Sequence, residues 1–574
     1  MSSAPSIPET APFTPEQRQW LNGLLAGMFS GNEALGASEP VAKKPEVVVL
    51  YGSQSGNTET LADSFGERLN ASGFQANVVS MEDHEEVDLA SKEHVLLLSS
   101  TWGDGDPPDS AIGFWEKLSA EDHPRMEKLQ FSVLALGDTN YLTFCEFGKQ
   151  LDSRLEALGA TRMAARVDCD TDFEEPADKW FSAVLTGLES TTGAGTKTET
   201  STAPPKKAWG RSNPFPAKLK TNLELNSKES ARDTRHFEIE LGDSGLSYEA
   251  GDALGVIPTN CPQYVEDLLQ AAGYTGDEPI GDKTLRQALT EDYAITLPSP
   301  KLMIEFASRA DSAELTALLD DKEKMADYLW GREIVDLFVE YPKARWSAEE
   351  FVGLLSKMAP RLYSISSSSK AHPGEVHLTV ARVGYETHGR ERKGVASTFL
   401  SDRIAEDGAV PIYVQPNKHF KVPADTQAPM IMVGPGTGIA PFRAFLEERQ
   451  ATHSPGKNWL FFGNPHESSD YLYQEQLEAA KADGSLARLD LAWSRDGAEK
   501  VYVQDLMRKS AQELWAWLEE GAYFFVCGDA KRMAKDVDKA LHAAIETAGG
   551  KTPEEAAAYV NDLKTSKRYV RDVY

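Results

Sequence analysis

The chain has 574 residues, which at roughly 100–200 residues per domain indicates three or more domains rather than one small binding module. Its 41% hydrophobic and 26% charged residues are typical of soluble globular proteins, and no apolar run approaches the ~20 residues that span a bilayer. Lys and Arg number 59 against 89 Asp and Glu, a net charge of −30 that disfavours nucleic acid and anionic membranes and favours basic protein partners.

The four cysteines lie far apart and form no Cys-x-x-Cys pair, which argues against a cysteine-only iron–sulfur or zinc cage and against a disulfide framework. We therefore expect a cytoplasmic protein without a metal site. Residues 1–10 contain no basic residue and no apolar stretch, so we expect no signal peptide.

Residues 1–45 are expected to form an N-terminal helix and a connector. Large apolar side chains recur at helical spacing between Thr14 and Ser30, and Pro15 suits the first turn. The pattern predicts a short amphipathic helix that packs on a neighbouring domain or on a second subunit. Membrane contact is the less favoured alternative, because Lys and Arg do not line its polar face.

Residues 46–188 alternate apolar runs with helical sequence, which predicts a doubly wound parallel α/β domain. The expected strands are Val47–Tyr51, Asn77–Ser80, His94–Ser100 and Phe131–Gly137. Residues 189–208 are then rich in Thr, Ser, Gly and Pro, a composition typical of a flexible linker on which a domain can swing.

Residues 209–425 are β-rich, and helical sequence interrupts them from about 261 to 357, which predicts a β-barrel with a helical insert. The expected strands are Lys218–Asn226, Thr234–Leu241, Ala253–Pro258, Leu362–Ser366 and Glu375–Val383. Residues 426–574 predict a second parallel α/β domain. Its expected strands are Met430–Val433, Asn458–Gly463, Arg488–Trp493 and, as the last core strand, Tyr523–Cys527.

Three loops of the first domain follow strands, at the sheet edge where open α/β sheets bind ligands. The first, Gly52–Thr58, gathers hydroxyls and backbone N–H groups at a helix N-terminus, which suits a phosphate; a plain turn is an equal alternative. The other two are residues 99–108 and 136–141. Their Trp102 and Tyr141 could sandwich a planar ring, or could instead close an edge of the core.

Together, these loops resemble those of a flavodoxin-like FMN domain. The resemblance implies that the first loop holds the FMN phosphate and that the others surround the isoalloxazine, with Trp102 and Tyr141 stacking on it. The implied FMN contacts are Ser53, Gln54, Ser55, Gly56, Asn57, Thr58, Ser100, Thr101, Trp102, Gly103, Leu136, Gly137, Asp138, Thr139, Asn140, Tyr141 and Cys145.

The barrel carries a second group of cofactor-type side chains. Arg361 suits a pyrophosphate, Tyr363 a flavin ring and Ser364 the neighbourhood of its reactive nitrogen. Gly394–Thr398, at the start of a predicted helix, offers further N–H donors. These segments resemble the FAD barrel of the ferredoxin–NADP reductase family. The FAD contacts are then Arg361, Leu362, Tyr363, Ser364, Thr379, Val380, Ala381, Tyr385, Gly394, Val395, Ala396 and Ser397.

The last domain carries a glycine-rich loop, Gly434–Pro441, that follows a predicted strand and permits close approach of a dinucleotide pyrophosphate. Cations and hydroxyls at 494–504 suit the 2′-phosphate that distinguishes NADPH from NADH. Cys527–Asp529 resembles the nicotinamide-side motif of the same family. The expected NADP contacts are Gly436, Thr437, Ser494, Arg495, Lys500, Val501, Tyr502, Val503, Gln504 and Asp536.

The order of these domains resembles that of NADPH-dependent diflavin reductases of the cytochrome P450 reductase type. In that family the final aromatic residue lies over the flavin and moves aside for nicotinamide. The resemblance assigns this stacking to Tyr574 and a supporting catalytic cluster to Ser364, Cys527 and Asp572. It also implies that electrons pass from NADPH through FAD and FMN to a hemoprotein.

Three segments resemble the sulfite reductase branch of this family: residues 13–28, Gly463–His466 and Arg568–Tyr574. The resemblance implies a partner subunit with sirohaem and an iron–sulfur cluster that converts sulfite to sulfide, and a homo-oligomer formed through the N-terminal segment. Two alternatives stay open: a soluble reductase for a cytochrome P450 or another haem protein, and a non-catalytic flavin-binding or assembly protein. No nucleic-acid or membrane partner is expected.

Overall fold

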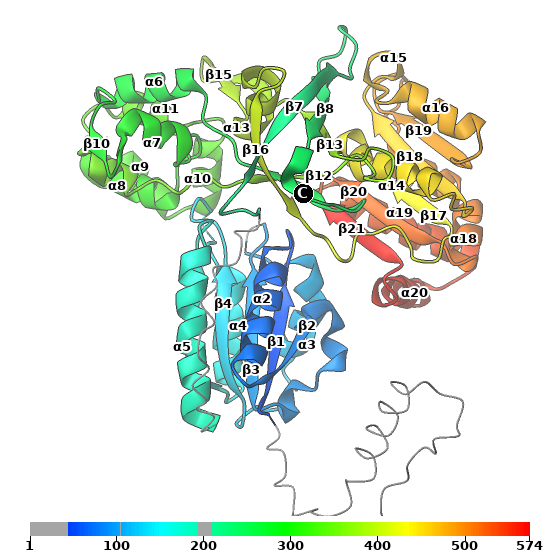
Figure 1. The fold of residues 1–574 in the computed structure, drawn as a ribbon, viewed down its shortest axis with the longest axis horizontal. Helices are drawn as coiled ribbons and strands as arrows, with labels where there is room; N and C mark the ends of the chain where they lie inside the picture. Colours follow the sequence, from blue (N-terminus) through cyan, green and yellow to red (C-terminus); the bar gives the residue numbers. More distant parts are fainter. Residues whose placement is uncertain (1–43, 104, 142, 193–208) are drawn as a thin grey trace, which may run out of the picture.

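The computed structural model describes residues 44–103, 105–141, 143–192 and 209–574. The predicted N-terminal helix and residues 193–208 of the predicted linker lie outside these ranges. One α/β domain lies at the bottom of Figure 1, and the rest of the described chain forms a wider body above it. Within the described residues, no helix combines the length and hydropathy needed to cross a bilayer.

The first domain is a parallel sheet with helices on both faces. Its elements are β1 (Glu46–Gly52), α2 (Asn57–Ala71), β2 (Gln75–Ser80), η2 (Met81–Glu86), η3 (Leu89–Ser91), β3 (His94–Ser100), η4 (Asp109–Ala111), α3 (Ile112–Ser119), β4 (Gln130–Leu136), α4 (Glu146–Ala157), β5 (Thr161–Arg162), β6 (Val167–Cys169) and α5 (Glu174–Thr192). The strand order is β2-β1-β3-β4-β5, and β6 also pairs with β4. Alternate residues of each strand pack under α2 and α5 on one face and under α3 and α4 on the other.

Helix α5 extends past residue 188, where the composition predicted the start of a linker. Leu188 is fully buried and anchors the last part of the helix in the core. The Ser190 hydroxyl donates to the Gly187 carbonyl at 2.7 Å. The expected boundary was wrong because a buried turn carries the helix into sequence that is polar enough to resemble a linker.

The second domain is the predicted barrel. Its strands are β7 (Phe215–Glu224), β8 (Thr234–Glu240), β9 (Ala253–Val256), β12 (Arg361–Ser364), β13 (Glu375–Ala381) and β16 (Ala409–Gln415). They pair antiparallel in the order β12-β9-β16-β7-β8-β13. A bridge between Ile365 and Leu378 joins the two ends, so the sheet closes on itself. The sequence analysis missed β16, which pairs with β7 and β9 in the middle of this order.

The helical insert is confirmed and has a hydrophobic core of its own. It contains α6 (Pro262–Ala272), β10 (Pro279–Ile280), β11 (Lys283–Thr284), α7 (Leu285–Glu291), α8 (Pro300–Ala310), α9 (Ala313–Leu319), α10 (Lys322–Leu329), α11 (Ile334–Glu340) and α12 (Ala348–Val352). After β13 come β14 (Gly384–Thr387), β15 (Arg390–Lys393), α13 (Val395–Thr398) and the π-helix η6 (Phe399–Arg403).

The third domain is a five-stranded parallel sheet in the order β19-β18-β17-β20-β21. Its elements are β17 (Met430–Val433), η7 (Gly436–Ile439), α14 (Ala440–Ala451), β18 (Asn458–Asn464), α15 (Glu467–Asp470), α16 (Gln474–Ala482), β19 (Arg488–Trp493), α17 (Val503–Lys509), α18 (Ala511–Glu519), β20 (Tyr523–Gly528), α19 (Met533–Gly549), α20 (Pro553–Thr565) and β21 (Tyr569–Val573). The sequence analysis expected Tyr523–Cys527 as the last core strand and did not predict the edge strand that follows it. Strand β21 adds an edge to the sheet and places Asp572 beside Cys527 in the register.

Candidate flavin and nucleotide sites

The first loop of the flavodoxin-like domain is shaped by its own hydrogen bonds. The Thr58 hydroxyl donates to the Gly52 carbonyl at 2.8 Å, and the Gly56 N–H donates to the Ser53 hydroxyl at 2.9 Å. Gly56 has a φ of 80°, which a glycine adopts without strain, and it ends the loop at the start of α2. The loop therefore presents hydroxyls and free N–H groups at a helix N-terminus, as a phosphate site requires.

The second loop leaves a buried hydroxyl without a partner. The Ser100 Oγ, at the end of β3, has no hydrogen-bond partner among the described residues. The next residue, Thr101, makes two hydrogen bonds. Its N–H donates to the Leu136 carbonyl, and its hydroxyl accepts from the Phe147 N–H. An unpaired buried hydroxyl beside the predicted flavin fits a polar ligand atom at this position.

The third loop faces the helical insert. The Thr139 hydroxyl contacts the Ser356 hydroxyl at 2.9 Å, and Ser356 in turn donates to the Asn140 side chain at 3.1 Å. Burial raises the pKa of the Asp138 carboxyl. A Cβ on Gly137 would lie 2.9 Å from the backbone nitrogen of Cys145, which is fully buried, so this loop tolerates no side chain there.

A cavity of about 600 Å³ brings parts of all three domains together. Of the predicted site residues, those that line it are Ser53, Gln54, Ser55, Gly56, Trp102, Arg361, Leu362, Tyr363, Ser364, Thr379, Val380, Ala381, Thr437, Asp572 and Tyr574. The predicted phosphate loop of the first domain and the predicted FAD strand of the barrel thus share one cavity. Two flavins bound at these places would lie close together.

Several predicted site residues lie outside the lining of this cavity. They are Asn57, Thr58, Ser100, Thr101, Gly103, Leu136, Gly137, Asp138, Thr139, Asn140, Tyr141, Cys145, Tyr385, Gly394, Val395, Ala396, Ser397, Gly436, Ser494, Arg495, Lys500, Val501, Tyr502, Val503, Gln504, Cys527 and Asp536. Trp102 lines the cavity whereas Tyr141 does not, and the Tyr141 side chain is 55% exposed. That Trp102 and Tyr141 stack on the two faces of one flavin ring remains a prediction.

The barrel side of the cavity is strand β12. It pairs with β9, which places Tyr363 opposite Leu254 and Ser364 opposite Ala253. Burial raises the pKa of Tyr363 to about 12, so this ring is neutral at physiological pH. Thr379, on β13, is held by a 2.6 Å contact between its hydroxyl and that of Tyr473. The strand therefore offers a neutral aromatic ring and a serine hydroxyl on one wall.

The predicted phosphate segment at Gly394 makes local contacts of its own. The Gly394 N–H donates to the Val383 carbonyl at 3.0 Å, and the Val383 N–H donates to the Ser397 hydroxyl at 3.1 Å. Tyr385 lies on the neighbouring hairpin strand β14 and is 50% exposed. These contacts anchor the segment beside β13 and leave the N–H groups of its short helix for a ligand.

The predicted catalytic cluster is assembled by β12, β20 and β21. The Ser364 hydroxyl donates to Asp572 Oδ2 at 2.6 Å, and the Cys527 sulfur lies 3.9 Å from the same oxygen. Burial raises the pKa of Asp572 and of the Cys527 thiol. The structure thus brings together three residues that are up to 208 positions apart in the sequence.

The C-terminal residue is held in place rather than frayed. The Tyr574 N–H donates to the Gly528 carbonyl at 3.0 Å, and the Tyr574 carbonyl accepts from the Ala530 N–H at 3.1 Å. Its hydroxyl contacts that of Thr437 at 2.7 Å. The ring lines the cavity and is 55% exposed.

The backbone of the predicted nucleotide loop packs closely against the end of the third sheet. A Cβ on Gly434 would lie 2.4 Å from the Gly438 carbonyl oxygen, and one on Gly438 would lie 2.2 Å from the Cys527 carbonyl oxygen. Downstream, the Ser494 N–H donates to the Asn464 carbonyl at 3.1 Å, which places Ser494 and the exposed Arg495 at the end of β18. Lys500 and Tyr502 are also exposed near this edge.

Comparison with known proteins decides the family. Three domain models match the chain: Flavodoxin at residues 49–180, FAD binding domain at 208–399 and Oxidoreductase NAD-binding domain at 432–539. The sulfite reductase [NADPH] flavoprotein alpha-component of Bacillus subtilis is 45% identical over 98% of this chain and 96% of its own length. Its counterparts in Mannheimia succiniciproducens and Escherichia coli K12 are 43% and 40% identical over 99% and 98% of this chain, and over 99% and 96% of their own lengths.

The chain belongs to the sulfite reductase flavoprotein alpha-component family. As a member of this family it is an NADPH-dependent flavoprotein oxidoreductase, and its three domains are those that bind FMN, FAD and NADPH. The residues present fit these groups. The unpaired Ser100 hydroxyl and the crowded glycines Gly137, Gly434 and Gly438 all lie where the fold places a ligand.

The sequence analysis missed some residues of the flavoprotein's central cavity. Gln415, Asn417 and His419 line it; Gln415 is the last residue of the unpredicted strand β16, and the other two follow that strand. Recognising the alternating pattern of β16 would have placed this turn at the cavity.

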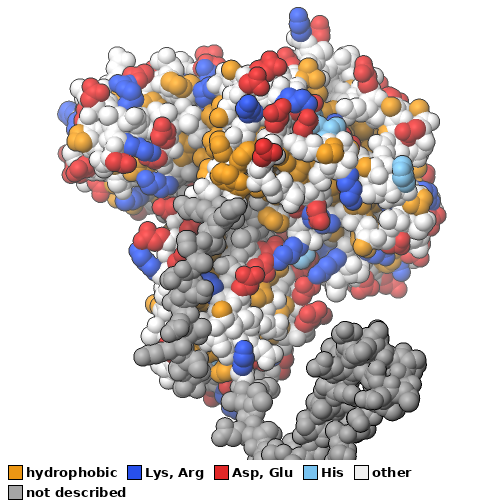
Figure 2. Space-filling model, viewed as in Figure 1, with side chains coloured by type: hydrophobic (Ala, Val, Ile, Leu, Met, Phe, Trp, Pro, Cys, Tyr) orange, Lys and Arg blue, Asp and Glu red, His pale blue; other side chains and the backbone are white. Residues whose placement is uncertain are grey.

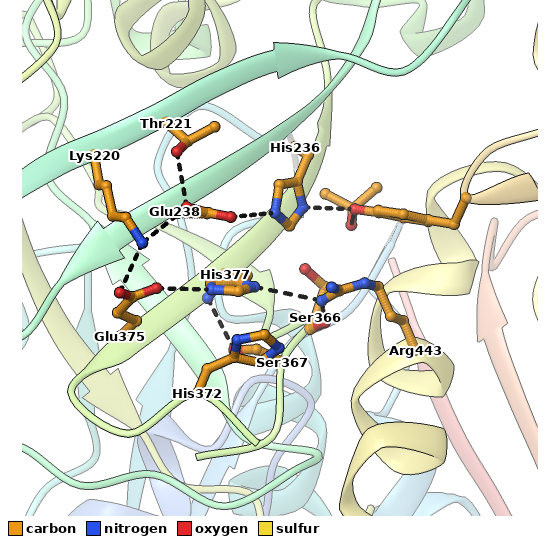
Figure 3. Close-up of polar contacts among 12 residues, drawn as sticks. Lys220, Thr221, His236, Glu238, Ser366, Ser367, His372, Glu375, His377 and Arg443 are labelled. Carbon is orange, nitrogen blue, oxygen red and sulfur yellow. Dashed lines mark hydrogen bonds and ion pairs between the residues drawn. The ribbon is translucent and has the colours of Figure 1, made fainter. Parts of the chain in front are cut away.

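The sequence analysis also missed a polar cluster between β8, β13 and the third domain (Figure 3). The register places His377 directly opposite Glu238. His236 Nε2 lies 3.6 Å from Glu238 Oε1, and His377 Nε2 lies 3.4 Å from Glu375 Oε2. Two sets of side chains that share His377 could each hold a metal ion: one also contains His236 and Glu238, and the other His372 and Glu375.

The hydrogen bonds of this cluster favour a network of polar side chains over a metal site. Arg443 Nη1 lies 3.4 Å from His377 Nδ1, and because a guanidinium only donates, Nδ1 accepts and the imidazole proton lies on Nε2. A metal ion on Nε2 would move that proton to Nδ1, against the Arg443 donors. Lys220 also bridges Glu375 at 2.8 Å and Glu238 at 3.3 Å (Figure 3). The cluster therefore joins the barrel to helix α14, which carries Arg443.

Proposed function

We propose that this flavoprotein is the electron-supplying component of an assimilatory NADPH-dependent sulfite reductase. When bound, the cofactors supply the redox chemistry, in which electrons pass from NADPH to FAD, then to FMN and on to a hemoprotein subunit that reduces sulfite to sulfide. The observation that carries this proposal is the cavity shared by the phosphate loop at Ser53–Gly56, the strand Arg361–Ser364 and the C-terminal Tyr574.

The chain's own residues have distinct roles in this proposal. Ser53 to Thr58 bind the FMN phosphate, and Arg361 binds the FAD pyrophosphate. Tyr574 covers the flavin ring and shields it from water until the nicotinamide displaces it. Asp572 holds the Ser364 hydroxyl in a fixed orientation at 2.6 Å, so that this hydroxyl meets the reacting ring in one geometry.

The proposed partner is a hemoprotein with sirohaem and an iron–sulfur cluster. The net charge of −30 supports a partner with a basic contact surface. On the face seen in Figure 2, acidic side chains are spread over the described domains rather than gathered in one patch. Self-association through the N-terminal segment belongs to the same proposal. So does a cytoplasmic location, where the four unpaired thiols stay reduced.

Flavin content and electron transfer test the proposal together. The purified protein is expected to carry FMN and FAD in equal amounts, and to reduce cytochrome c with NADPH. Expression in a strain that lacks its own sulfite reductase flavoprotein is expected to restore growth on sulfate. A protein that reduces cytochrome c but fails to restore growth would favour a reductase for another haem protein. One that binds flavin but is not bleached by NADPH would favour a non-catalytic role.

A further inference from the structure

Four polar side chains form a path that leads from the central cavity to the surface of the barrel. This polar path consists of Thr379, Tyr473, His236 and Glu238. Its inner end is Thr379, which lies on β13 and lines the cavity. The antiparallel bridge between Ile365 and Leu378 sets the register of this strand against the end of β12, and extending it by one residue places Thr379 opposite Ser364. The polar path therefore begins beside the serine of the proposed flavin site.

Successive members of the polar path lie close together. The Thr379 hydroxyl lies 2.6 Å from that of Tyr473, and the Tyr473 hydroxyl lies 2.9 Å from His236 Nδ1. The other ring nitrogen of His236, Nε2, lies 3.6 Å from Glu238 Oε1. Figure 3 shows Glu238 between His236 and Lys220, and the side chains of Glu238 and Lys220 are 24% and 43% exposed. The outer end of the polar path thus reaches solvent.

The hydrogen-bond donors of the polar path all point outward. Burial acts to raise the pKa of Glu238, but the hydrogen bonds that its carboxylate accepts outweigh burial and lower the pKa to about 2, so this group only accepts. Burial lowers the pKa of His236 to about 4, so the ring is neutral at pH 7 and its one proton, facing Glu238, lies on Nε2. Nδ1 then accepts from the Tyr473 hydroxyl, which in turn accepts from Thr379. Each group can therefore take a proton from its inner neighbour and pass its own proton outward.

Tyr473 takes its place in the polar path through a strained backbone. Its φ is 55°, in the left-handed region that a bulky side chain occupies only at an energetic cost. It is the residue before α16 of the third domain, and its side chain is buried. This conformation brings its hydroxyl to two residues of the barrel, Thr379 and His236. Strain of this kind is typical of residues that a fold holds for a function.

We propose that Thr379, Tyr473, His236 and Glu238 conduct a proton from the flavin site to solvent. This inference rests on the proposed function. NADPH supplies a hydride, which is one proton and two electrons, and one-electron acceptors take only the electrons. The balance is NADPH → NADP⁺ + H⁺ + 2e⁻, so one proton per NADPH must leave. A proton that reaches Thr379 displaces the next one along the polar path, until the Nε2 proton of His236 passes to Glu238 and on to water. This last step needs the carboxylate to move about half an ångström closer, because 3.6 Å is longer than a hydrogen bond.

Proton release can be measured apart from hydride transfer. The flavin-loaded full chain is mixed with one equivalent of NADPH and two of ferricyanide, in weak buffer that contains a pH indicator. His236→Gln keeps an amide that can contact both neighbours but does not carry a proton from one to the other, and Tyr473→Phe removes one hydroxyl. We expect both variants to release the proton about 10-fold more slowly or worse, still at one proton per NADPH. The first phase of flavin reduction without ferricyanide moves only the hydride and should stay within about twofold of the wild type.

A matched control and a measurement without turnover complete the test. His377→Gln is the same substitution on the neighbouring strand, opposite Glu238 in the register and outside the polar path, and it should leave proton release within about twofold. The flavin spectrum of each variant confirms that both cofactors are retained. NMR of ¹⁵N-labelled histidine at neutral pH reports where the His236 proton lies. We expect it on Nε2, and we expect the Nδ1 signal to shift in Tyr473→Phe.

Three results would overturn the proposal. Proton release that keeps its rate in both His236→Gln and Tyr473→Phe would exclude the polar path. An equal slowing in His377→Gln would show that the packing of the cluster matters and not the path. A His236 proton on Nδ1 would mean that the donors do not all point outward. The proposed function fails separately, if the wild-type protein does not reduce ferricyanide with NADPH, and the NMR measurement still tests the polar path in that case.

Discussion

Asp572 is a carboxyl group whose surroundings favour keeping a proton. Burial raises its pKa, while the hydrogen bond from Ser364 acts in the opposite direction. The neighbouring Cys527 thiol is fully buried and its pKa is raised as well, so the sulfur is protonated at neutral pH. The cluster therefore places a buried carboxyl group with a raised pKa and a protonated thiol beside the ring that we propose Tyr574 covers.

Replacing Ser364 tests whether this cluster orients the reaction. We expect Ser364→Ala to slow the reduction of flavin by NADPH by about 10-fold or more, because the hydroxyl that donates to Asp572 is lost. Losing that donor also raises the pKa of Asp572 further, so the pH profile of the reduction rate should move to higher pH. Rapid-mixing absorbance measures both.

The control is Ser401→Ala, which removes a serine–aspartate hydrogen bond of the same 2.6 Å length, to Asp402, outside the cavity. A similar slowing in both variants would show that Ser364 acts only through stability.

Replacing Gly438 by Ala tests whether the close approach of the nucleotide loop to β20 matters for stability. A Cβ there would lie 2.2 Å from the Cys527 carbonyl oxygen, and both groups belong to the backbone of packed elements. Gly438→Ala is expected to lower the thermal midpoint of the third domain by several degrees, since overpacking costs about 1–3 kcal/mol. NADP⁺ affinity should fall with it. Gly210→Ala is the control, because a Cβ there meets nothing within 4 Å; an unchanged midpoint in Gly438→Ala would contradict the argument.

The sequence predicted the buried parallel strands and most strands of the barrel, but it did not predict β16 or β21. The strands at 47–51 and 430–433 and the segment 95–98 of β3 are continuous apolar runs, because helices cover both faces of their sheets. Strands β16 and β21 mix apolar residues with Pro, Gln, Arg and Asp. Their partners are distant in the sequence, so only the fold shows that the strand at 569–573 pairs with β20.

The same reason limits what could be predicted of the sites. The loops at Ser53 and at Gly436 follow predictable strands, so their place at a sheet edge could be expected. The cluster of His236 and His377 could not, because it depends on the register between β8 and β13.

The His236–His377 cluster predicts how stability depends on pH. Burial, with Arg443 nearby, lowers the pKa of His377 to about 3 and that of His236 to about 4. Both values lie below the unfolded value of about 6.5, so between roughly pH 4 and 6.5 the unfolded chain binds more protons. Stability is therefore full above pH 6.5 and falls as the pH drops, by about 1.4 kcal/mol per pH unit for each histidine.

Thermal midpoints at several pH values in this window measure the slope. The charged and titratable groups around the pair are Lys220, Glu238, His372, Glu375, Arg443 and Glu447. His377→Gln is expected to be less stable than the wild type at pH 7.5 and to lose stability less steeply on acidification. His453→Gln, at an exposed position, is the control. If the thermal midpoint falls equally steeply with pH in the wild type and both variants, the cluster does not cause the loss of stability at low pH.

At the scale of the whole molecule, the FMN domain faces the other two domains across the shared cavity. Lys418 pairs with Asp63, Lys567 with Asp83 at 3.1 Å and Arg571 with Asp109 at 2.9 Å. Each of these contacts joins the FMN domain to the body above it in Figure 1. This arrangement suits transfer between the flavins but turns the phosphate loop inward. If the chain delivers electrons to an outside hemoprotein as proposed, we expect the FMN domain to separate from the body.

Ionic strength is expected to shift the balance between these arrangements. The pairs are at least partly exposed, so each contributes about 0–1 kcal/mol and is screened by salt. We expect the radius of gyration from small-angle X-ray scattering to rise between about 20 mM and about 500 mM salt. The double variant Lys418→Ala, Lys567→Ala should expand at lower salt than the wild type. Lys457→Ala breaks an equally exposed pair inside the third domain and should leave the curve unchanged. If neither salt nor the double substitution changes the radius of gyration, packing and not these charges holds the domains together.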